Sequence, residues 1–475
     1  MANQSQESLE KQSSSSSSSS SSVVVIVVPF PAQSHLNQLL QLSHIISSHN
    51  IPVHYLGSAL HISQVQSRAI HVVNQERIQF HDFPTPHFLS PPPNDTKFPS
   101  HLFPSFEASV ESLRKPFADL LTSLSQTERK VVVIYDPATS SVVHDSCRFP
   151  NAEVYIFHCV SSLFSSAYIR DTMGIQIGND DCKLDNIPSL EGTMTPEVLA
   201  FMANQNQFAT NIKKSGHVYN TCRLIESAFL DLMLKIERER NEDVKMWAIG
   251  PLETVTIFKN RLNGSQHKCL EWLDKQRPNS VLYVSFGTTT FMEDEQIKEL
   301  ALGLEQSEVN FLWVLRDADK GNVFDEVRRP QLPDRFEERV REKGMVVRDW
   351  APQLEILGHN STGGFMSHCG WNSCLESMSL GVPIAAWPMH SDQPVNAVFI
   401  TEVLKVGMLA RNWKRKEELV SSSEISEVVK KLMNSKEGDE ARKRAEEFGN
   451  ELREATADGG VSHIELDSFL AHISR

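Results

Sequence analysis

The stretch HCGWNSCLES, from His368 to Ser377, gathers residue types that suit the binding of an anion. A short apolar run precedes it, and a helical pattern, a Gly-Val-Pro stop and another apolar run follow it. This order predicts a turn from strand to helix at the carboxyl end of a sheet, which is where α/β folds bind ligands. The first N–H groups of such a helix are free, and an imidazole beside them can donate to phosphate oxygens. The stretch therefore predicts a phosphate-binding turn.

A purely structural explanation competes for part of this stretch. Ser373 and Glu376 have the spacing of an S-x-x-E capping box, which is a common way to begin a helix. Taken alone, the four residues from Ser373 to Glu376 favour helix capping over ligand binding. His368 and Trp371 favour a binding site, because a helix needs neither residue in order to begin.

A second histidine stands at the start of another predicted helix. His35 lies in PFPAQSHLNQ, directly after the first apolar strand. The N-terminus of a helix disfavours the imidazolium ion, so the neutral ring is available to accept a proton as a general base. A histidine in such a place is more often a surface or capping residue, so a catalytic role depends on a partner.

Short β-branched runs alternate with helical patterns along the whole chain. Near-continuous apolar strands between helices indicate parallel sheets that are covered on both faces. A stretch rich in Gly, Pro and Asn, residues 247–268, interrupts the alternation. We therefore expect an α/β protein of two doubly wound domains across a cleft. The strands are predicted at 23–28, 53–57, 78–81, 131–135, 154–157, 281–286, 311–315, 345–348, 364–367 and 384–387.

The same patterns predict the limits of the domains. The serine-rich beginning of the chain has no apolar face and is expected to be disordered. The final helix carries apolar residues at helical spacing, is expected to be capped by Ser462, and is expected to pack back toward the N-terminal domain. The predicted segments are a tail over 1–22, an N-terminal domain over 23–251, a linker over 252–267, a C-terminal domain over 268–450 and the final helix over 451–475.

Composition and charge narrow the class of partner. The chain has 475 residues, 40% of them hydrophobic, and a formal net charge of −14 without a basic block. Such a charge argues against binding to nucleic acid or to an anionic membrane. The seven cysteines are scattered and form no C-x-x-C pair, as in a reduced chain. The first apolar run is too short to span a bilayer. We expect a cytoplasmic monomer that binds small molecules.

The segment from Trp350 to Gln393 resembles the signature box of the plant family 1 UDP-glycosyltransferases. The stretches CLEWLDKQRPNSVLYVSFGT, FLWVLR, LPDRFEERV and VVRDWAPQ fit the same family, so the resemblance covers nearly everything after the serine tail. It implies the GT-B fold, in which two Rossmann-like domains face each other. The N-terminal domain would bind the acceptor, and the C-terminal domain would bind the UDP-sugar.

Within that family, VPFPAQSHLNQ, FPSHLFPSFEAS, EWLDKQ and GGFMSHCGWNSCLES resemble the zeatin O-glucosyltransferases and O-xylosyltransferases. This implies an inverting enzyme that transfers glucose from UDP-glucose to the side-chain hydroxyl of a zeatin-type cytokinin, with no cofactor and no metal. A transferase of flavonoids, isoflavones or other small phenols is an alternative, and xylose is an alternative sugar. A UDP-sugar-binding protein without catalysis is an alternative of another class.

The resemblance also assigns the donor site residue by residue. Each role has a simple chemistry: a planar ring for the base, a carboxylate for the ribose diol, and hydrogen-bonding groups for the diphosphate and the sugar. The residues are Trp350, Ala351 and Gln353 at the nucleoside, Glu376 at the ribose, Thr288, His368, Trp371, Asn372 and Ser373 at the diphosphate turn, and Asp392 and Gln393 at the sugar.

The resemblance supplies the partner of His35 as well. The catalytic aspartate of the family follows the strand that VVVIYD matches here, which makes it Asp136. Its carboxylate would fix the imidazole tautomer and stabilise the cation while His35 takes the acceptor proton. The family usually has glycine where this chain has Ser34. Serine would be strained if the turn needs a positive φ, and favourable if the position is an N-cap.

Two further stretches leave alternatives open. Asp317 and Asp319 mimic the D-x-D metal site of the other glycosyltransferase fold, although acidic residues in a polar loop are usually only solvated. The segments 85–106 and 158–166 are expected to line the acceptor pocket, although proline-rich loops are often only stiff connectors.

Overall fold

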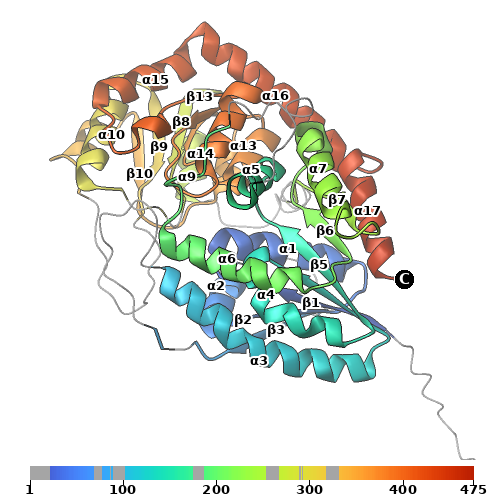
Figure 1. The fold of residues 1–475 in the computed structure, drawn as a ribbon. Coiled ribbons are helices and arrows are strands. Elements are labelled where there is room, and N and C mark those ends of the chain that lie inside the picture. Colours follow the sequence, from blue (N-terminus) through green and yellow to red (C-terminus); the bar gives the residue numbers. More distant parts are fainter. Residues whose placement is uncertain are drawn as a thin grey trace, which may run out of the picture.

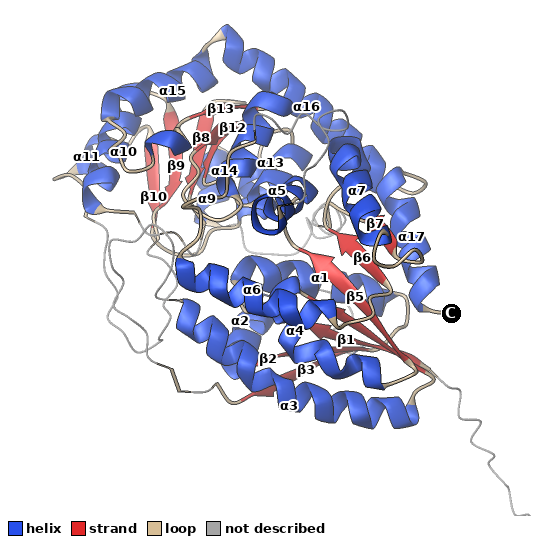
Figure 2. Cartoon of the chain, in the orientation of Figure 1, coloured by secondary structure: helices blue, strands red, loops and turns tan. Residues whose placement is uncertain are grey.

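The computed structural model describes residues 22–68, 77–85, 87–88, 102–174, 187–252, 267–287, 290, 292–316 and 331–475. These residues form two α/β halves, one below and one above in Figure 1, and each half is built on one parallel sheet. The predicted fold class is therefore confirmed. Helices cover both faces of each sheet (Figure 2), as parallel sheets require.

The sheet of the N-terminal half has seven strands in the order β3-β2-β1-β4-β5-β6-β7. Every neighbouring pair is parallel. Strands β6 and β7 were not predicted, because four-residue strands that contain Gly, His or Lys carry little β-branched signal. The strands are β1 Val23–Val28, β2 Val53–Ser58, β3 Ile78–Phe83, β4 Lys130–Tyr135, β5 Ala152–His158, β6 Gly216–Tyr219 and β7 Lys245–Ala248.

The sheet of the C-terminal half has six parallel strands in the order β10-β9-β8-β11-β12-β13. The three-residue strand β13 was not predicted either. The strands are β8 Val281–Ser285, β9 Asn310–Val314, β10 Gly344–Val347, β11 Thr362–Ser367, β12 Ile384–Ala386 and β13 Gly407–Leu409.

The helices that connect and cover these strands follow the alternation expected from the sequence. In the N-terminal half they are α1 Gln33–Ser48, α2 Ala59–Arg68, α3 Phe103–Thr127, α4 Ser140–Val143, α5 Ser162–Met173, α6 Pro196–Thr210 and α7 Arg223–Arg238. The later ones are α9 Lys268–Leu273, α10 Asp294–Ser307, α11 Phe336–Arg339, α12 Gln353–Leu357, α13 Trp371–Ser379, α14 Gln393–Val398, α15 Ser422–Asn434, α16 Lys436–Thr456 and α17 Val461–Ile473.

The side chains of β1 show why the first sheet is buried on both faces. Val25 and Val27 belong to the hydrophobic core on one face, whereas Val24, Ile26 and Val28 belong to the core on the other. A strand whose residues are apolar on both sides is stable only between two layers of helices. This places the carboxyl end of β1, and the helix α1 that follows it, in the middle of the half.

The C-terminal helix α17 packs against the N-terminal half, beside α7 and β7 in Figure 1. Phe469 and Ile473 are fully buried in the same core as Val25 and Val27. The sequence predicts that Ser462 caps α17, and this prediction is wrong. The helix begins after Gly460, and the Ser462 hydroxyl donates to the carbonyl of Gly250 at 2.7 Å. The signal was wrong because a serine near a helix start binds whichever acceptor the tertiary fold brings close.

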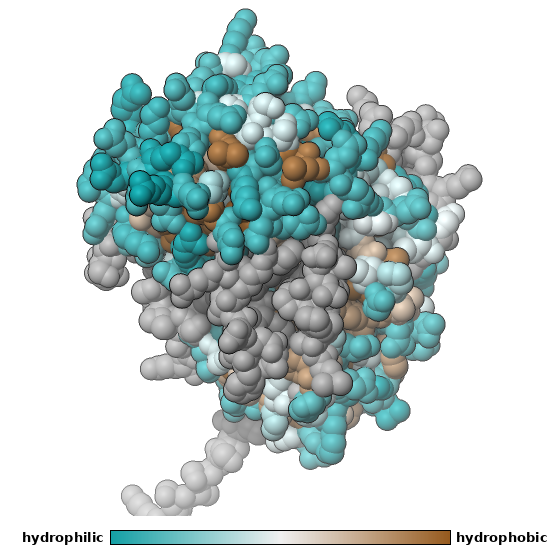
Figure 3. Space-filling model, turned by 90° about the vertical axis from the view of Figure 1, so that its left-hand side faces the viewer, coloured by the Kyte–Doolittle hydropathy of each residue, from teal (hydrophilic) through white to brown (hydrophobic). Residues whose placement is uncertain are grey.

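The face shown in Figure 3 is mostly hydrophilic over the C-terminal half, with hydrophobic residues in separate patches. Scattered apolar groups of this kind are normal on a surface in contact with water. Among the described helices, none combines the length and the apolar character that crossing a bilayer would demand.

Candidate active site

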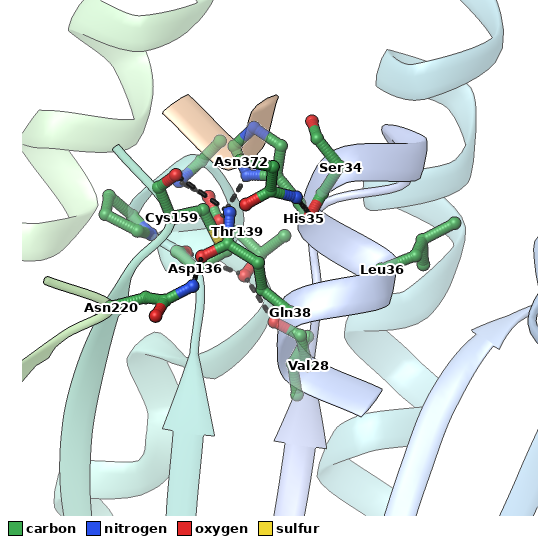
Figure 4. A network of polar contacts seen from close by, with 12 residues as sticks. Val28, Ser34, His35, Leu36, Gln38, Asp136, Thr139, Cys159, Asn220 and Asn372 are labelled. Atoms are coloured by element: carbon green, nitrogen blue, oxygen red, sulfur yellow. Dashed lines mark hydrogen bonds and ion pairs between the residues drawn. The ribbon is translucent and has the colours of Figure 1, made fainter. Parts of the chain in front are cut away.

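The structure brings His35 and Asp136 together at the carboxyl edge of the first sheet (Figure 4). Strands β1 and β4 are neighbours in register, with Val28 opposite Tyr135, so the residues that follow them emerge side by side. Asp136 directly follows β4, and His35 is the third residue of α1. Nδ1 of His35 lies 2.6 Å from Oδ2 of Asp136.

The surroundings of the pair fix its orientation. Asp136 is 2% exposed, and its other oxygen accepts the backbone N–H of Ala138 at 2.9 Å. Because Nδ1 of His35 is engaged by the carboxylate, Nε2 remains as the nitrogen that can take a proton. Burial lowers the pKa of His35, but the charge and hydrogen bond of Asp136, with a smaller contribution from Asp392, outweigh burial and leave the pKa raised.

Ser34 fits neither of the two situations considered from the sequence. Helix α1 begins at Gln33 after Ala32, so Ser34 is not the N-cap, and it is not among the described residues with a positive φ. Its carbonyl accepts the side-chain amide of Asn372 at 3.2 Å, from the opposite half of the molecule. Serine is therefore accommodated inside the first turn of the helix without strain.

Gln353 and Glu376 face each other, and Trp350 lies three residues before Gln353, between β10 and α12. Trp350 is 56% exposed, so much of the residue is accessible to solvent. Gln353 donates to Oε2 of Glu376 at 2.6 Å and to Oγ of Ser373 at 3.1 Å. Ala351, next to the indole, is nearly buried. The group combines an exposed aromatic residue with a carboxylate and an amide, which suits a base attached to a diol.

The capping box considered for Ser373 and Glu376 is not formed. Helix α13 begins at Trp371 with Gly370 as its N-cap, so Ser373 is already the third residue of the helix. Its hydroxyl accepts from Gln353, and Glu376 also faces Gln353. The two polar side chains thus face α12 and do not cap the start of α13.

His368 follows β11 and lies close to two glycines. A Cβ atom at Gly287 or Gly370 would stand 2.8 or 2.7 Å from its Nε2, so both positions require glycine for the ring to stay where it is. Burial lowers the pKa of His368 to about 4, which makes the ring neutral at pH 7. Nδ1 of His368 and Oδ1 of Asn372 are buried and have no hydrogen-bond partner among the described residues.

Two other residues expected at the UDP-sugar site, Trp371 and Gln393, make hydrogen bonds within the protein. The indole of Trp371 is 2% exposed and donates to the carbonyl of Asn220 at 2.9 Å, so its ring lies against the N-terminal half. Oε1 of Gln393 accepts the N–H groups of Met389 and His390 at 2.9 and 3.0 Å, which shapes the turn before α14.

Asp392 stands between the two halves of the site. Burial raises its pKa, while hydrogen bonds from Asn396 and the backbone of Trp371, and the nearby His35, act in the opposite direction. Thr288 lies outside the described residues, so the structure says nothing of its position.

One cluster in the described part of the chain has the donor set for a metal ion. The ligand atoms of His35, Asp136 and Cys159 lie within 4.8 Å of one another. Imidazole, carboxylate and thiolate together suit zinc. The alternative metal motif, Asp317 and Asp319, lies outside the described residues.

Sequence models of known families match both halves. Residues 21–254 match the model "Glycosyltransferase, N-terminal domain", and residues 261–443 match "UDP-glucoronosyl and UDP-glucosyl transferase". The zeatin O-xylosyltransferase of Phaseolus vulgaris is 50% identical over 94% of this chain and 97% of its own length. The zeatin O-glucosyltransferase of Phaseolus lunatus is also 50% identical, over 94% and 96%.

Solved structures agree with these matches. A UGT of Medicago truncatula complexed with UDP-glucose superimposes with a TM-score of 0.73 at 25% identity, over 96% of this chain and 99% of that one. A UGT of Phytolacca americana complexed with a fluorinated UDP-glucose and pterostilbene gives a TM-score of 0.72 at 26% identity, over 95% of this chain and 99% of that one. The chain therefore belongs to the family of UDP-dependent glycosyltransferases with the GT-B fold.

Proposed function

We propose that this enzyme transfers glucose from UDP-glucose to the side-chain hydroxyl of a zeatin-type cytokinin, with inversion at the anomeric carbon. The observation that carries the proposal is the pair of His35 and Asp136, which stands opposite the start of α13 from the other half. One half thus offers a proton acceptor, and the other offers the N-terminus of a helix.

The proposed reaction is a single displacement. Nε2 of His35 takes the proton of the acceptor hydroxyl as its oxygen attacks C1 of the sugar, and the bond from C1 to the diphosphate oxygen breaks. Asp136 stabilises the imidazolium that forms. The negative charge on the departing UDP is met by the N-terminus of α13 and by His368.

We assign the acceptor to the N-terminal half and the donor to the C-terminal half. Trp350 stacks on the uracil, Gln353 and Glu376 contact the nucleoside, and Asn372 and Ser373 lie at the diphosphate. The exposed indole and the neighbouring carboxylate support this assignment. Trp371 and Gln393 contribute by shaping the loops, since their side chains are occupied within the protein.

The choice of a cytokinin is supported by the two bean relatives, whose names specify zeatin as acceptor and glucose or xylose as the sugar. We further propose that the enzyme acts as a cytoplasmic monomer without a metal cofactor. None of the cysteines in the described part forms a disulfide, which is the usual state in a reducing compartment.

A comparison of sugar donors and acceptors tests this function. The purified protein is incubated with UDP-glucose or UDP-xylose and with trans-zeatin, cis-zeatin, a flavonol or an isoflavone, and the products are read by mass spectrometry. We expect a zeatin O-glucoside as the main product. A main product on a flavonoid would refute the acceptor, a xyloside would refute the sugar, and UDP-sugar binding without any product would refute the transferase.

A further inference from the structure

A chain of three hydrogen bonds runs close to His35 and Asp136, and Figure 4 shows three of its members, Gln38, Cys159 and Asn220. The backbone N–H of Leu252 donates to Oδ1 of Asn220 at 3.1 Å. Nδ2 of Asn220 donates to Oε1 of Gln38 at 2.8 Å, and Nε2 of Gln38 donates to the carbonyl of Cys159 at 2.9 Å. Gln38 is 1% exposed and Asn220 is fully buried. The chain thus links the end of the N-terminal sheet to the helix that carries His35.

The direction of this chain is fixed at both ends. The N–H of Leu252 can only donate, and the carbonyl of Cys159 can only accept. Each amide between them therefore has one possible orientation, and turning either around would break two hydrogen bonds at once. A buried polar network in which each of these groups is satisfied holds its members rigidly.

The C-terminal half, to which we assign the UDP-sugar, is attached to the same network. The indole of Trp371, the first residue of α13, donates to the backbone carbonyl of Asn220 at 2.9 Å. The next residue, Asn372, donates to the carbonyl of Ser34 at 3.2 Å. Helix α13 is therefore connected to α1 on both sides of His35: directly at the preceding residue, and through Asn220 at Gln38, about one turn later.

We propose that Gln38 and Asn220 are positioning residues, which transmit the position of α13 to the turn of α1 that carries His35. The inference rests on the proposed function, because it takes His35 as the base. Reacting groups must be aligned within a fraction of an ångström, and a displacement of about 1 Å costs on the order of 100-fold in rate. Gln38 and Asn220 do not touch the substrates in this scheme. They keep the imidazole aligned with the donor that α13 binds.

The substitution Gln38→Met tests the proposal, because methionine has a similar length but makes no hydrogen bond to Cys159 or Asn220. We expect kcat to fall by about 10- to 100-fold, while the Kd for UDP, measured by calorimetry, stays within about threefold. Gln41→Met is the matched control on the next turn of the same helix, since Oε1 of Gln41 has no hydrogen-bond partner among the described residues. We expect its kcat to stay close to that of the wild type.

The pH profile separates positioning from a general loss of structure. If the turn of α1 relaxes, the contact between His35 and Asp136 lengthens, and burial then lowers the pKa of His35. The acidic limb of kcat/KM should therefore move to lower pH in Gln38→Met. An unchanged limb, or a loss of kcat no larger than that of Gln41→Met, would overturn the proposal.

Gln38→Glu provides a second variant of nearly unchanged shape in case the methionine variant does not fold. An ionised carboxylate cannot donate to Cys159, whereas a protonated one can donate there and still accept from Asn220. Its kcat relative to the wild type should therefore recover as the pH is lowered, and a constant ratio would contradict the proposal. A wild-type protein that forms no glycoside would instead refute the proposed function, so the two failures are distinguishable.

Discussion

The side-chain amide of Asn372 donates to the carbonyl oxygen of Ser34 at 3.2 Å, although the two residues belong to opposite halves of the molecule. Ser34 directly precedes His35, and Asn372 is the second residue of α13. The turn assigned to the diphosphate and the turn that carries the base are thus in contact through one hydrogen bond. In the proposed reaction, the proton transfer and the departure of UDP would therefore take place at two turns that are in direct contact.

The substitution Asp136→Asn should lower kcat by about 100-fold or more, because the imidazolium loses its stabilising charge. Since Asp136 raises the pKa of His35 against the effect of burial, its loss should also shift the acidic limb of kcat/KM to lower pH. Initial rates across the pH range measure both effects. Asp119→Asn, at an exposed position on α3, is the control. A limb that stays in place would show that Asp136 does not act on the base.

The substitution Trp350→Ala should weaken UDP binding by about 1–3 kcal/mol, the usual contribution of a stacked base. This corresponds to a Kd about 5- to 150-fold higher in calorimetry. The thermal midpoint should hardly change, because the indole is 56% exposed. Trp413→Ala, a substitution of the same kind in the short 3₁₀ helix after β13, should leave the Kd unchanged. Equal affinities for all three proteins would exclude stacking at Trp350.

Excess EDTA should leave the turnover unchanged, because the helix N-terminus and His368 meet the charge of the leaving group. The measurement compares initial rates before and after chelation and after the return of Mg²⁺, Mn²⁺ or Zn²⁺. A loss of activity that a divalent cation restores would point to a metal, and the cluster of His35, Asp136 and Cys159 would then be the first place to examine.

The substitution Phe469→Ala should lower the free energy of unfolding by about 3–5 kcal/mol. Phe469 is fully buried and meets Tyr155 and Trp247 edge-on at 5.7 and 5.3 Å between ring centroids. Chemical denaturation measures the loss. Ile464→Ala on the same helix is the control, because Ile464 is 57% exposed and should cost little. Similar losses for both variants would mean that α17 is not anchored by its buried face.

Much of the fold could be predicted because long β-branched runs identify buried parallel strands, as in β1 and β4. The short strand β6, which places Asn220 at its carboxyl end, gave no comparable signal. The cap predicted at Ser462 and the capping box weighed as an alternative at Ser373 are both absent, for one reason. A hydroxyl near a helix start signals a cap only locally, and tertiary contacts decide what it binds.

In the candidate site too, some residues could be identified from the sequence and others only from their tertiary contacts. Asp136 was identified through the resemblance to the family, and the parallel register of β1 and β4 explains why it reaches His35. Gln38 and Asn220 were missed, because a lone buried amide looks like a surface residue until its partners are known. One local signal was available: Gln38 interrupts the buried apolar face of α1, between Leu36 and Leu39.

The central claim is that His35 takes the proton of the acceptor hydroxyl, and the substitution His35→Ala tests it most directly. The preformed complex of enzyme and UDP-glucose is mixed with excess trans-zeatin, and a single turnover is followed. The rate of glycoside formation should fall by about 10²- to 10⁴-fold relative to the wild type, with the Kd for UDP-glucose unchanged. His49→Ala, at the exposed end of the same helix, should react at the wild-type rate. Full activity in the His35 variant would contradict the account, because no imidazole would then be needed to take the proton.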